Sequence, residues 1–176
     1  MSRGSNDMTR IRRTALGAAL LGAAAVGLVA LPSAAQQPPI ASEPLSPRSV
    51  FTDDVDVKLK VKIDGRERMV VNAKDPSRTL VSRFTVQPGA KFPWHTHPGP
   101  VIVNVTQGEL VYVDSEDCAK HSYAAGTAFV DPGHGHAHTA YNPGGVPTVL
   151  VATFFEAPAA PAPLLIPADT PEGCDV

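Results

Sequence analysis

Residues 89–108 have the sequence GAKFPWHTHPGPVIVNVTQG, and residues 126–142 have the sequence GTAFVDPGHGHAHTAYN. In the first stretch His95 and His97 lie two residues apart, and in the second His136 and His138 repeat this spacing. Residues i and i+2 of a β-strand project from the same face, so each pair can direct two imidazoles at one ion. Imidazole nitrogen is a ligand for Zn²⁺, Fe²⁺, Cu²⁺ and Ni²⁺. The two stretches therefore predict a metal site.

Short β-rich runs surround these histidines. Val55–Ile63 alternates apolar and polar residues, and Asp64-Gly65 then supplies a turn to a partner strand at Met69–Val71. Glycine and proline turns separate the further runs, which are Leu80–Gln87, Val101–Thr106, Glu109–Asp114, Thr127–Val130, His136–Tyr141 and Val149–Glu156. No segment after residue 35 keeps a helical period. The pattern predicts an all-β sandwich or barrel.

The two histidine stretches resemble the two sequence motifs of the cupin superfamily. The first motif, G-x5-H-x-H-x3–4-E-x6-G, is matched without its Glu at Gly89, His95, His97 and Gly108. The second, G-x5-P-x-G-x2-H-x3-N, is matched with one residue inserted after the proline, at Gly126, Pro132, Gly135, His138 and Asn142. The resemblance covers residues 80 to 145. It implies a single-domain cupin jelly-roll β-barrel that holds one divalent metal ion through His95, His97 and His138.

The motif's carboxylate ligand would fall at Val101, or at Ile102 with the longer spacing, and neither side chain can bind a metal. An ion held only by neutral imidazoles keeps its full charge and is a stronger Lewis acid. The chain resembles the cupins, thiol and diketone dioxygenases among them, that use three histidines on iron. The ion itself is open among Fe, Zn, Mn, Cu and Ni. The alternative is that the metal was lost with the Glu, which leaves a small-ligand pocket.

Alternation predicts that Val101 and Val103 face the same side as the histidines and form an apolar wall of a substrate pocket. Trp94 and Tyr141 are close in sequence to the ligands, so we expect them at the mouth of this pocket, although core packing explains both aromatics equally well. His136 has three open interpretations: a fourth ligand, a proton carrier beside the ion, or a structural side chain at the rim.

The first 35 residues predict a signal peptide for the Sec or Tat route. Three arginines precede the uncharged run Thr14–Leu31, and small residues stand at Ser33 and Ala35. The alternative is an uncleaved membrane anchor. Export to the periplasm or the extracellular space would leave a Pro-rich linker at 36–50, the barrel at 51–157 and a Pro-rich tail at 158–176. Three aliphatic residues of this tail, Leu164 to Ile166, should pack back on the barrel.

Removal of residues 1–35 would leave 11 basic and 16 acidic side chains. This negative balance argues against nucleic acid or an anionic membrane as a partner, and favours a small-molecule ligand or substrate. A homodimer through an edge strand is also possible. Cys118 and Cys174 are the two cysteines, and in an exported chain they predict a disulfide bond; two separate thiols are the alternative.

Three functions are therefore open. The first is a metal-dependent enzyme, an iron oxygenase above all, that acts on a small and fairly apolar molecule. The second is a non-catalytic barrel that binds metal or a small ligand outside the cytoplasm. The third is a metal-free barrel used for protein contacts.

Overall fold

The computed structural model describes residues 37–62, 68–73, 76 and 78–176. The described residues are built of β-strands, and none of them forms a helix that could cross a membrane. They belong to one compact unit, which begins at Gln36. The predicted leader and the Asp64-Gly65 turn lie outside the described residues.

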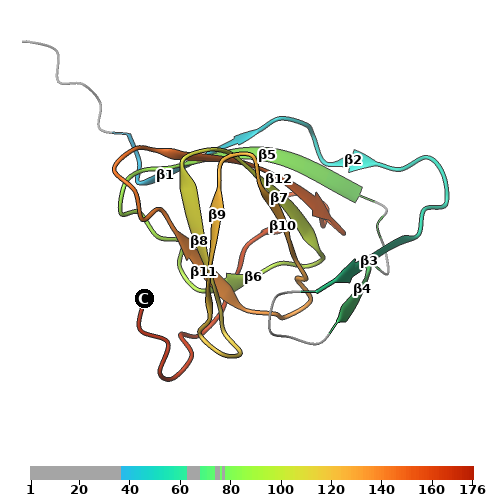
Figure 1. The fold of residues 1–176 in the computed structure, drawn as a ribbon. Coiled ribbons are helices and arrows are strands. Elements are labelled where there is room, and N and C mark those ends of the chain that lie inside the picture. Colours follow the sequence, from blue (N-terminus) through green and yellow to red (C-terminus); the bar gives the residue numbers. More distant parts are fainter. Residues whose placement is uncertain (1–36, 63–67, 74–75, 77) are drawn as a thin grey trace, which may run out of the picture. The chain divides into compact units, whose positions relative to one another are not determined.

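Two antiparallel sheets carry the fold (Figure 1). The first sheet runs in the order β1 (Ile40–Pro44), β5 (Arg78–Val86), β12 (Thr148–Phe155), β7 (Val101–Gln107) and β10 (Ala128–Asp131), and β2 (Ser49–Val50) also pairs with β5. The second runs β13 (Ile166–Pro167), β6 (His95–Thr96), β11 (His138–Tyr141), β8 (Glu109–Asp114) and β9 (Lys120–Ala124). A separate hairpin joins β3 (Val57–Val61) to β4 (Met69–Ala73). This arrangement confirms the predicted all-β class.

The core lies between the two sheets because each strand turns alternate side chains inward. On β12 the buried residues are Leu150, Ala152 and Phe154, which alternate with half-buried ones. The second sheet contributes Leu110 of β8 and Ala140 of β11 to the same hydrophobic cluster. Both sheets therefore share one apolar interior, as a barrel requires.

The structure differs from the predicted domain boundaries at the N-terminal side. Within the predicted linker, Ile40–Pro44 pairs with β5 from Ile40 opposite Val86 to Pro44 opposite Ser82. The prolines of this segment suggested a linker because proline cannot donate to a sheet, yet β1 is an edge strand, where Pro44 is tolerated. The sheet therefore starts at Ile40, ahead of the predicted boundary at residue 51.

The C-terminal tail is also part of the fold. Leu164 and Leu165 pack against the hydrophobic core, which confirms that this part of the tail folds back. Ile166 and Pro167 then pair with Thr96 and His95 of β6 as strand β13. The Pro- and Ala-rich sequence of the tail did not predict this strand, because two residues are too few to show a periodic pattern.

The β10–β11 loop brings the two histidine stretches together. Its Gly133 has a φ of 60°, and a Cβ there would lie 2.1 Å from the carbonyl oxygen of Gly99. The His134 amide donates a hydrogen bond to the carbonyl of His97 at 2.9 Å. Positive φ values at Gly133, His134 and Gly135 also end the extended backbone here, so β11 begins at His138 and not at the predicted His136.

We expect Gly133→Ala to be more destabilising than Gly135→Ala, since both glycines have positive φ but only Gly133 touches another backbone. The backbone strain of an L-residue is about 1–2 kcal/mol at either position. The contact with Gly99 should cost about 1–3 kcal/mol more in the Gly133 variant. Urea unfolding of both variants measures the difference, and equal losses of unfolding free energy would contradict this account of the loop.

Candidate metal centre

Three histidines of the two stretches meet inside the barrel. His95 lies on β6, His97 follows that strand directly, and His138 begins β11 as the cross-strand partner of His95. Their ring centroids are 4.3 Å (His95–His138), 4.9 Å (His95–His97) and 5.2 Å (His97–His138) apart. All three are buried, and one nitrogen from each lies within 4.8 Å of the others. The predicted ligand set therefore converges in space.

Each of these rings has its Nδ1 beside an oxygen acceptor. The acceptors are Pro93 O at 2.7 Å for His95, Leu164 O at 2.8 Å for His97, and Asp131 Oδ2 at 2.9 Å for His138. A carbonyl oxygen only accepts, so the Nδ1 atoms of His95 and His97 carry the hydrogen. This leaves Nε2 of each ring with its lone pair directed away from the acceptor. Such outer hydrogen bonds typically orient the imidazole ligands of a metal.

Burial keeps these rings in the form that binds metals. It lowers the pKa of His95 to about 3, together with the nearby His138 and against the hydrogen bond to Pro93 O. Burial also lowers the pKa of His97, although the charge of Asp131 works in the opposite direction. A neutral imidazole is the protonation state that coordinates a metal ion. Both rings are therefore prepared as ligands at neutral pH.

Asp131 is a buried carboxylate behind His138 that sequence reasoning did not single out. It accepts hydrogen bonds from the Gly133 amide at Oδ1 and from the Tyr112 hydroxyl at Oδ2, both at 2.8 Å. Burial would raise the pKa of Asp131, but the neighbouring His138, His97 and Tyr112 lower it overall. The carboxylate is therefore ionised, and it places one negative charge next to the three imidazoles.

A small cavity of about 50 Å³ lies against the three histidines. Val101 and Val103 line it, as the alternation along β7 predicts. Its other walls are largely apolar: Phe84, Phe92, Leu110, Phe129, Ala140, Leu150, Ala152, Phe154 and Leu165, with Tyr112 and Asp131 as polar members. The volume corresponds to one or two water molecules, at ~30 Å³ each. The interior thus offers an apolar space for a very small molecule.

The family model of the cupin domain matches residues 82–154, a range that includes all three histidines and both motif stretches. The chain belongs to the cupin superfamily.

Several solved structures are similar to this cupin. Oxalate oxidase is 27% identical over 44% of this chain and 41% of its own, with a TM-score of 0.40. A protein with a double-stranded β-helix domain from Klebsiella pneumoniae is 25% identical over 43% of this chain and 61% of its own, with a TM-score of 0.38. The cupin domain of an XRE-family transcriptional regulator from Enterobacter cloacae is 14% identical over 69% of this chain and 100% of its own, with a TM-score of 0.46. This chain therefore spans less than half the length of the oxalate oxidase, and no curated protein sequence matches it.

Val101, where the shorter motif spacing would place the cupin carboxylate, is 1% exposed and apolar. Its register partner across the first sheet is Asp131. Directly opposed residues of an antiparallel pair share a face, so a carboxylate stands beside the expected position, on the neighbouring strand. The sequence contained a signal for this carboxylate. Asp131 lies two residues after Phe129, so both side chains share the inward face of β10, and both line the cavity.

Trp94 and Tyr141, which the sequence suggested as pocket residues, do not line the cavity. They belong to a second apolar cluster with Val111, Val113 and Cys174. The reason is alternation: His95 and Ala140, their chain neighbours, face the interior, so Trp94 and Tyr141 face the other side of the second sheet.

His136 is not a member of the three-histidine group. Its Nε2 lies 3.0 Å from Asp114 Oδ2, and its Nδ1 lies 3.6 Å from Glu116 Oε1. Burial works to lower the pKa of His136, but Asp114 raises it above the usual value. The structure therefore places His136 beside two carboxylates and outside the group of converging histidines.

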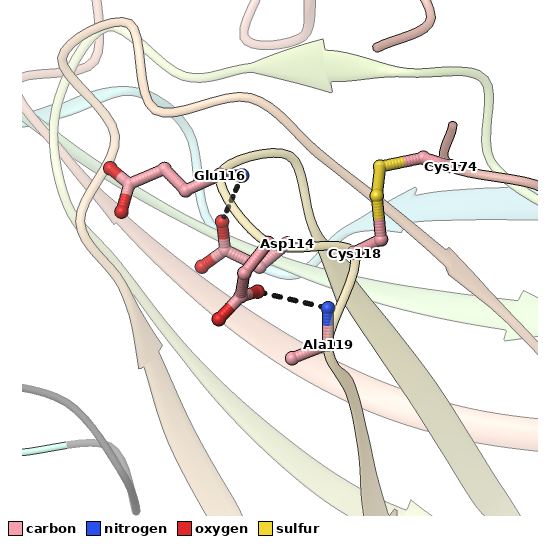
Figure 2. The surroundings of a disulfide bond; sticks show 6 residues. Asp114, Glu116, Cys118, Ala119 and Cys174 are labelled. Atoms are coloured by element: carbon pink, nitrogen blue, oxygen red, sulfur yellow. Dashed lines mark hydrogen bonds between the residues drawn. A yellow bond between two sulfur atoms is a disulfide. The ribbon is translucent and has the colours of Figure 1, made fainter. Parts of the chain in front are cut away.

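The predicted disulfide between Cys118 and Cys174 is present. Cys118 lies in the turn between β8 and β9, which Figure 2 shows beside Asp114 and Glu116. The Glu116 amide donates to Asp114 Oδ1 at 2.8 Å and so shapes this turn. Disulfides persist in oxidising compartments, so this bond fits an exported protein.

Asp131→Asn should weaken metal binding by about 10–100-fold, the usual cost of losing an outer partner of a histidine ligand. Three donors surround the Asp131 side chain, and between them they need an acceptor at each of its two carboxylate oxygens. The asparagine side chain has an acceptor oxygen on one side only. Titration with Zn²⁺ against a competing chelator measures the affinity.

Tyr112→Phe is the matched control for this experiment, because it removes one donor to Asp131 and leaves the contact with His138 in place. We expect a smaller loss of affinity in this variant. If Asp131→Asn bound Zn²⁺ as tightly as the wild type, Asp131 would have no part in orienting the ligand.

Proposed function

We propose that this cupin binds one divalent metal ion through Nε2 of His95, His97 and His138. The observation that carries the proposal is the set of three Nδ1 contacts, one for each ring, to acceptors from separate segments of the chain. These contacts turn the remaining nitrogen of each ring toward a common point in a buried and apolar space. Three imidazoles leave further coordination positions of the ion open for water or a ligand.

The charge balance supports a reactive ion. Three neutral imidazoles leave a divalent ion with its full charge, and Asp131 offsets part of it through His138 without contacting the ion as a ligand. We propose iron as the resident metal, because the cupins that use three histidines without the carboxylate include iron dioxygenases. An iron ion in this position would supply the activation of dioxygen.

The cavity limits what the site can take. Its volume of about 50 Å³ is far below the ~300–1,000 Å³ of ordinary ligand pockets. None of the residues that line it in the described part of the chain is Lys or Arg, so no side-chain cation is placed to bind an anionic substrate. The chain's own residues thus exclude bulk water and favour a small, uncharged molecule. We therefore propose a small-molecule oxygenase outside the cytoplasm.

The small cavity also favours a second candidate function, non-catalytic metal binding. Asp131 and the Tyr112 hydroxyl are already hydrogen-bonded to each other, and the Tyr112 pKa is raised well above 10, first by burial and then by the charge of Asp131. Neither group is therefore poised as a general acid or base for a substrate. A protein that only captures or stores the ion needs no such group.

Metal content tests the shared part of both functions. Protein purified from the exported fraction should carry roughly one equivalent of metal per chain, as expected for a closed structural or catalytic site. Elemental analysis should show that His97→Ala loses this metal and that His136→Gln keeps it, because only His97 belongs to the converging group.

The same samples test export by intact mass, which should correspond to a chain that starts at Gln36. Absence of metal in the wild type, with no uptake on addition of Fe²⁺ or Zn²⁺, would refute the proposed site. A chain that retains residues 1–35 would refute cleavage of the leader.

Oxygen consumption separates the enzyme from the binder. The iron-loaded protein should consume dioxygen when supplied with a member of a panel of small uncharged thiols and diketones. The zinc-loaded protein should not, because Zn²⁺ has no redox chemistry. A clear absence of turnover in an iron-loaded sample of proven stoichiometry would favour non-catalytic binding.

A further inference from the structure

The C-terminal residues Leu164–Cys174, here called the strap, reach the candidate metal centre directly. The carbonyl oxygen of Leu164 accepts the hydrogen bond from His97 Nδ1 at 2.8 Å. The side chain of Leu165 forms part of the cavity wall. The next two residues form β13, in which Pro167 is the register partner of the ligand His95. One short segment therefore contacts two of the three ligands and the cavity.

The pairing of the strap with the sheet is weak by itself. Strand β13 has two residues, both exposed, and it stands at the edge of the second sheet. One further backbone bond joins Ala168 N to Trp94 O at 3.0 Å. Short, exposed edge segments with few buried contacts open at low free-energy cost. Something else must hold the strap closed.

Two side-chain anchors lie on either side of β13. Before the strap, the Arg48 guanidinium donates to the carbonyl oxygens of Pro158 and of Ala162, the latter at 2.7 Å. At its far end, Cys174 is buried and bonded to Cys118. The strap is thus tied at both ends across the ligand strand β6.

The disulfide joins the strap to the other side of the ligand row. Four register partners cross the second sheet in the order Pro167, His95, His138 and Asp114. Cys118 lies in the turn that follows Asp114 (Figure 2), and its amide donates to the Asp114 carbonyl at 3.0 Å. The Cys118–Cys174 bond therefore links the chain after β13 to the turn after β8, and these two strands flank the ligand strands β6 and β11.

We infer that the strap is a working part of the metal centre, in which the Cys118–Cys174 disulfide clamps Leu164 and Leu165 over the ion. This inference rests on the proposed metal binding and assigns the disulfide a role at that same site. With the clamp in place, Leu164 holds His97 in the orientation that presents Nε2, and Leu165 closes the cavity. Without it, His97 loses its acceptor and the ion gains a route to solvent.

The test uses the chain from Gln36 to Val176 with both cysteines replaced, Cys118→Ser/Cys174→Ser, at a temperature where circular dichroism shows a folded protein. Zn²⁺ affinity should fall about 10–100-fold, as for other losses of an outer histidine partner. The rate of metal transfer to an excess of chelator should rise. The visible absorption of the Co²⁺-loaded protein should change, because the orientation of one ligand changes.

Val86→Ala is the control for lost stability alone. Val86 is fully buried on β5, which the strap does not pair with, and its truncation leaves a cavity in the core. Its Zn²⁺ affinity and Co²⁺ absorption should match the wild type. If this control lost as much affinity as the double serine variant, the disulfide would act only through stability and the inference would fail.

A second variant covers the case in which the double serine variant does not fold. Leu165→Ala keeps the disulfide and the Leu164 carbonyl, but removes part of the cavity wall. It should release metal faster than the wild type. An unchanged release rate in this variant, or unchanged affinity in a folded double serine variant, would overturn the role of the strap while leaving the proposed metal site intact. A wild type that binds no metal would instead refute the proposed function.

Discussion

Three imidazole rings lie inside one small apolar barrel, and the need to satisfy their polar atoms constrains much of the surrounding structure. An unpaired polar group in such an interior costs several kcal/mol, about 2–7 depending on the reference state. The Nδ1 acceptors come from the chain before β6, from the C-terminal segment and from the end of β10. Each of these segments has to be held in place for the histidines to keep their orientation. The Gly133–Gly99 contact and the disulfide can be understood as parts of that support.

Asp131 lies directly opposite Val101, the position at which the cupin carboxylate is missing. A carboxylate ligand at position 101 would share a face with Asp131, and two buried negative charges this close would repel each other strongly. Valine at 101 removes the repulsion and leaves a single anionic group in the site. Because that group contacts His138, its negative charge would lie behind a metal ligand and not in the coordination shell of a bound ion. A divalent ion bound at this site would be more electrophilic and would have more open positions.

The same arrangement explains why the cavity is small and largely apolar. The inward faces of β7, β12 and β10 bring valine, leucine and phenylalanine side chains up to the histidines, and Leu165 adds a wall from the C-terminal segment. In such a space electrostatic interactions are stronger than in water, so the Asp131 carboxylate and the charge of a bound ion would dominate the field. The second apolar cluster, around Trp94 and Cys174, lies on the other side of the ligand strand and supports it from outside.

Local patterns were sufficient to predict many of the strands and two of the converging histidines. A short β-rich run between turn residues located Glu109–Asp114 with its observed bounds, and the H-x-H spacing identified His95 and His97 as neighbours on one face. The cysteine pair in a chain with an export leader predicted the observed disulfide. These features depend on the period of a strand or on bond-forming chemistry, both of which can be read from a few residues.

Tertiary structure alone decided the remainder. The contacts of Asp131 with Tyr112 and His138, the contact of His136 with Asp114, and the position of Leu164 beside His97 arise from residues between 7 and 67 positions apart that no local period relates. Trp94 and Tyr141 are close to the ligands in sequence but lie outside the cavity, since strand alternation turns them to the opposite face. The composition and spacing of this sequence determined an all-β sandwich or barrel with two histidine pairs, and the resemblance to the cupin motifs selected His95, His97 and His138 among them. Which groups surround those ligands was decided by strand register, because register is a property of how distant segments pair.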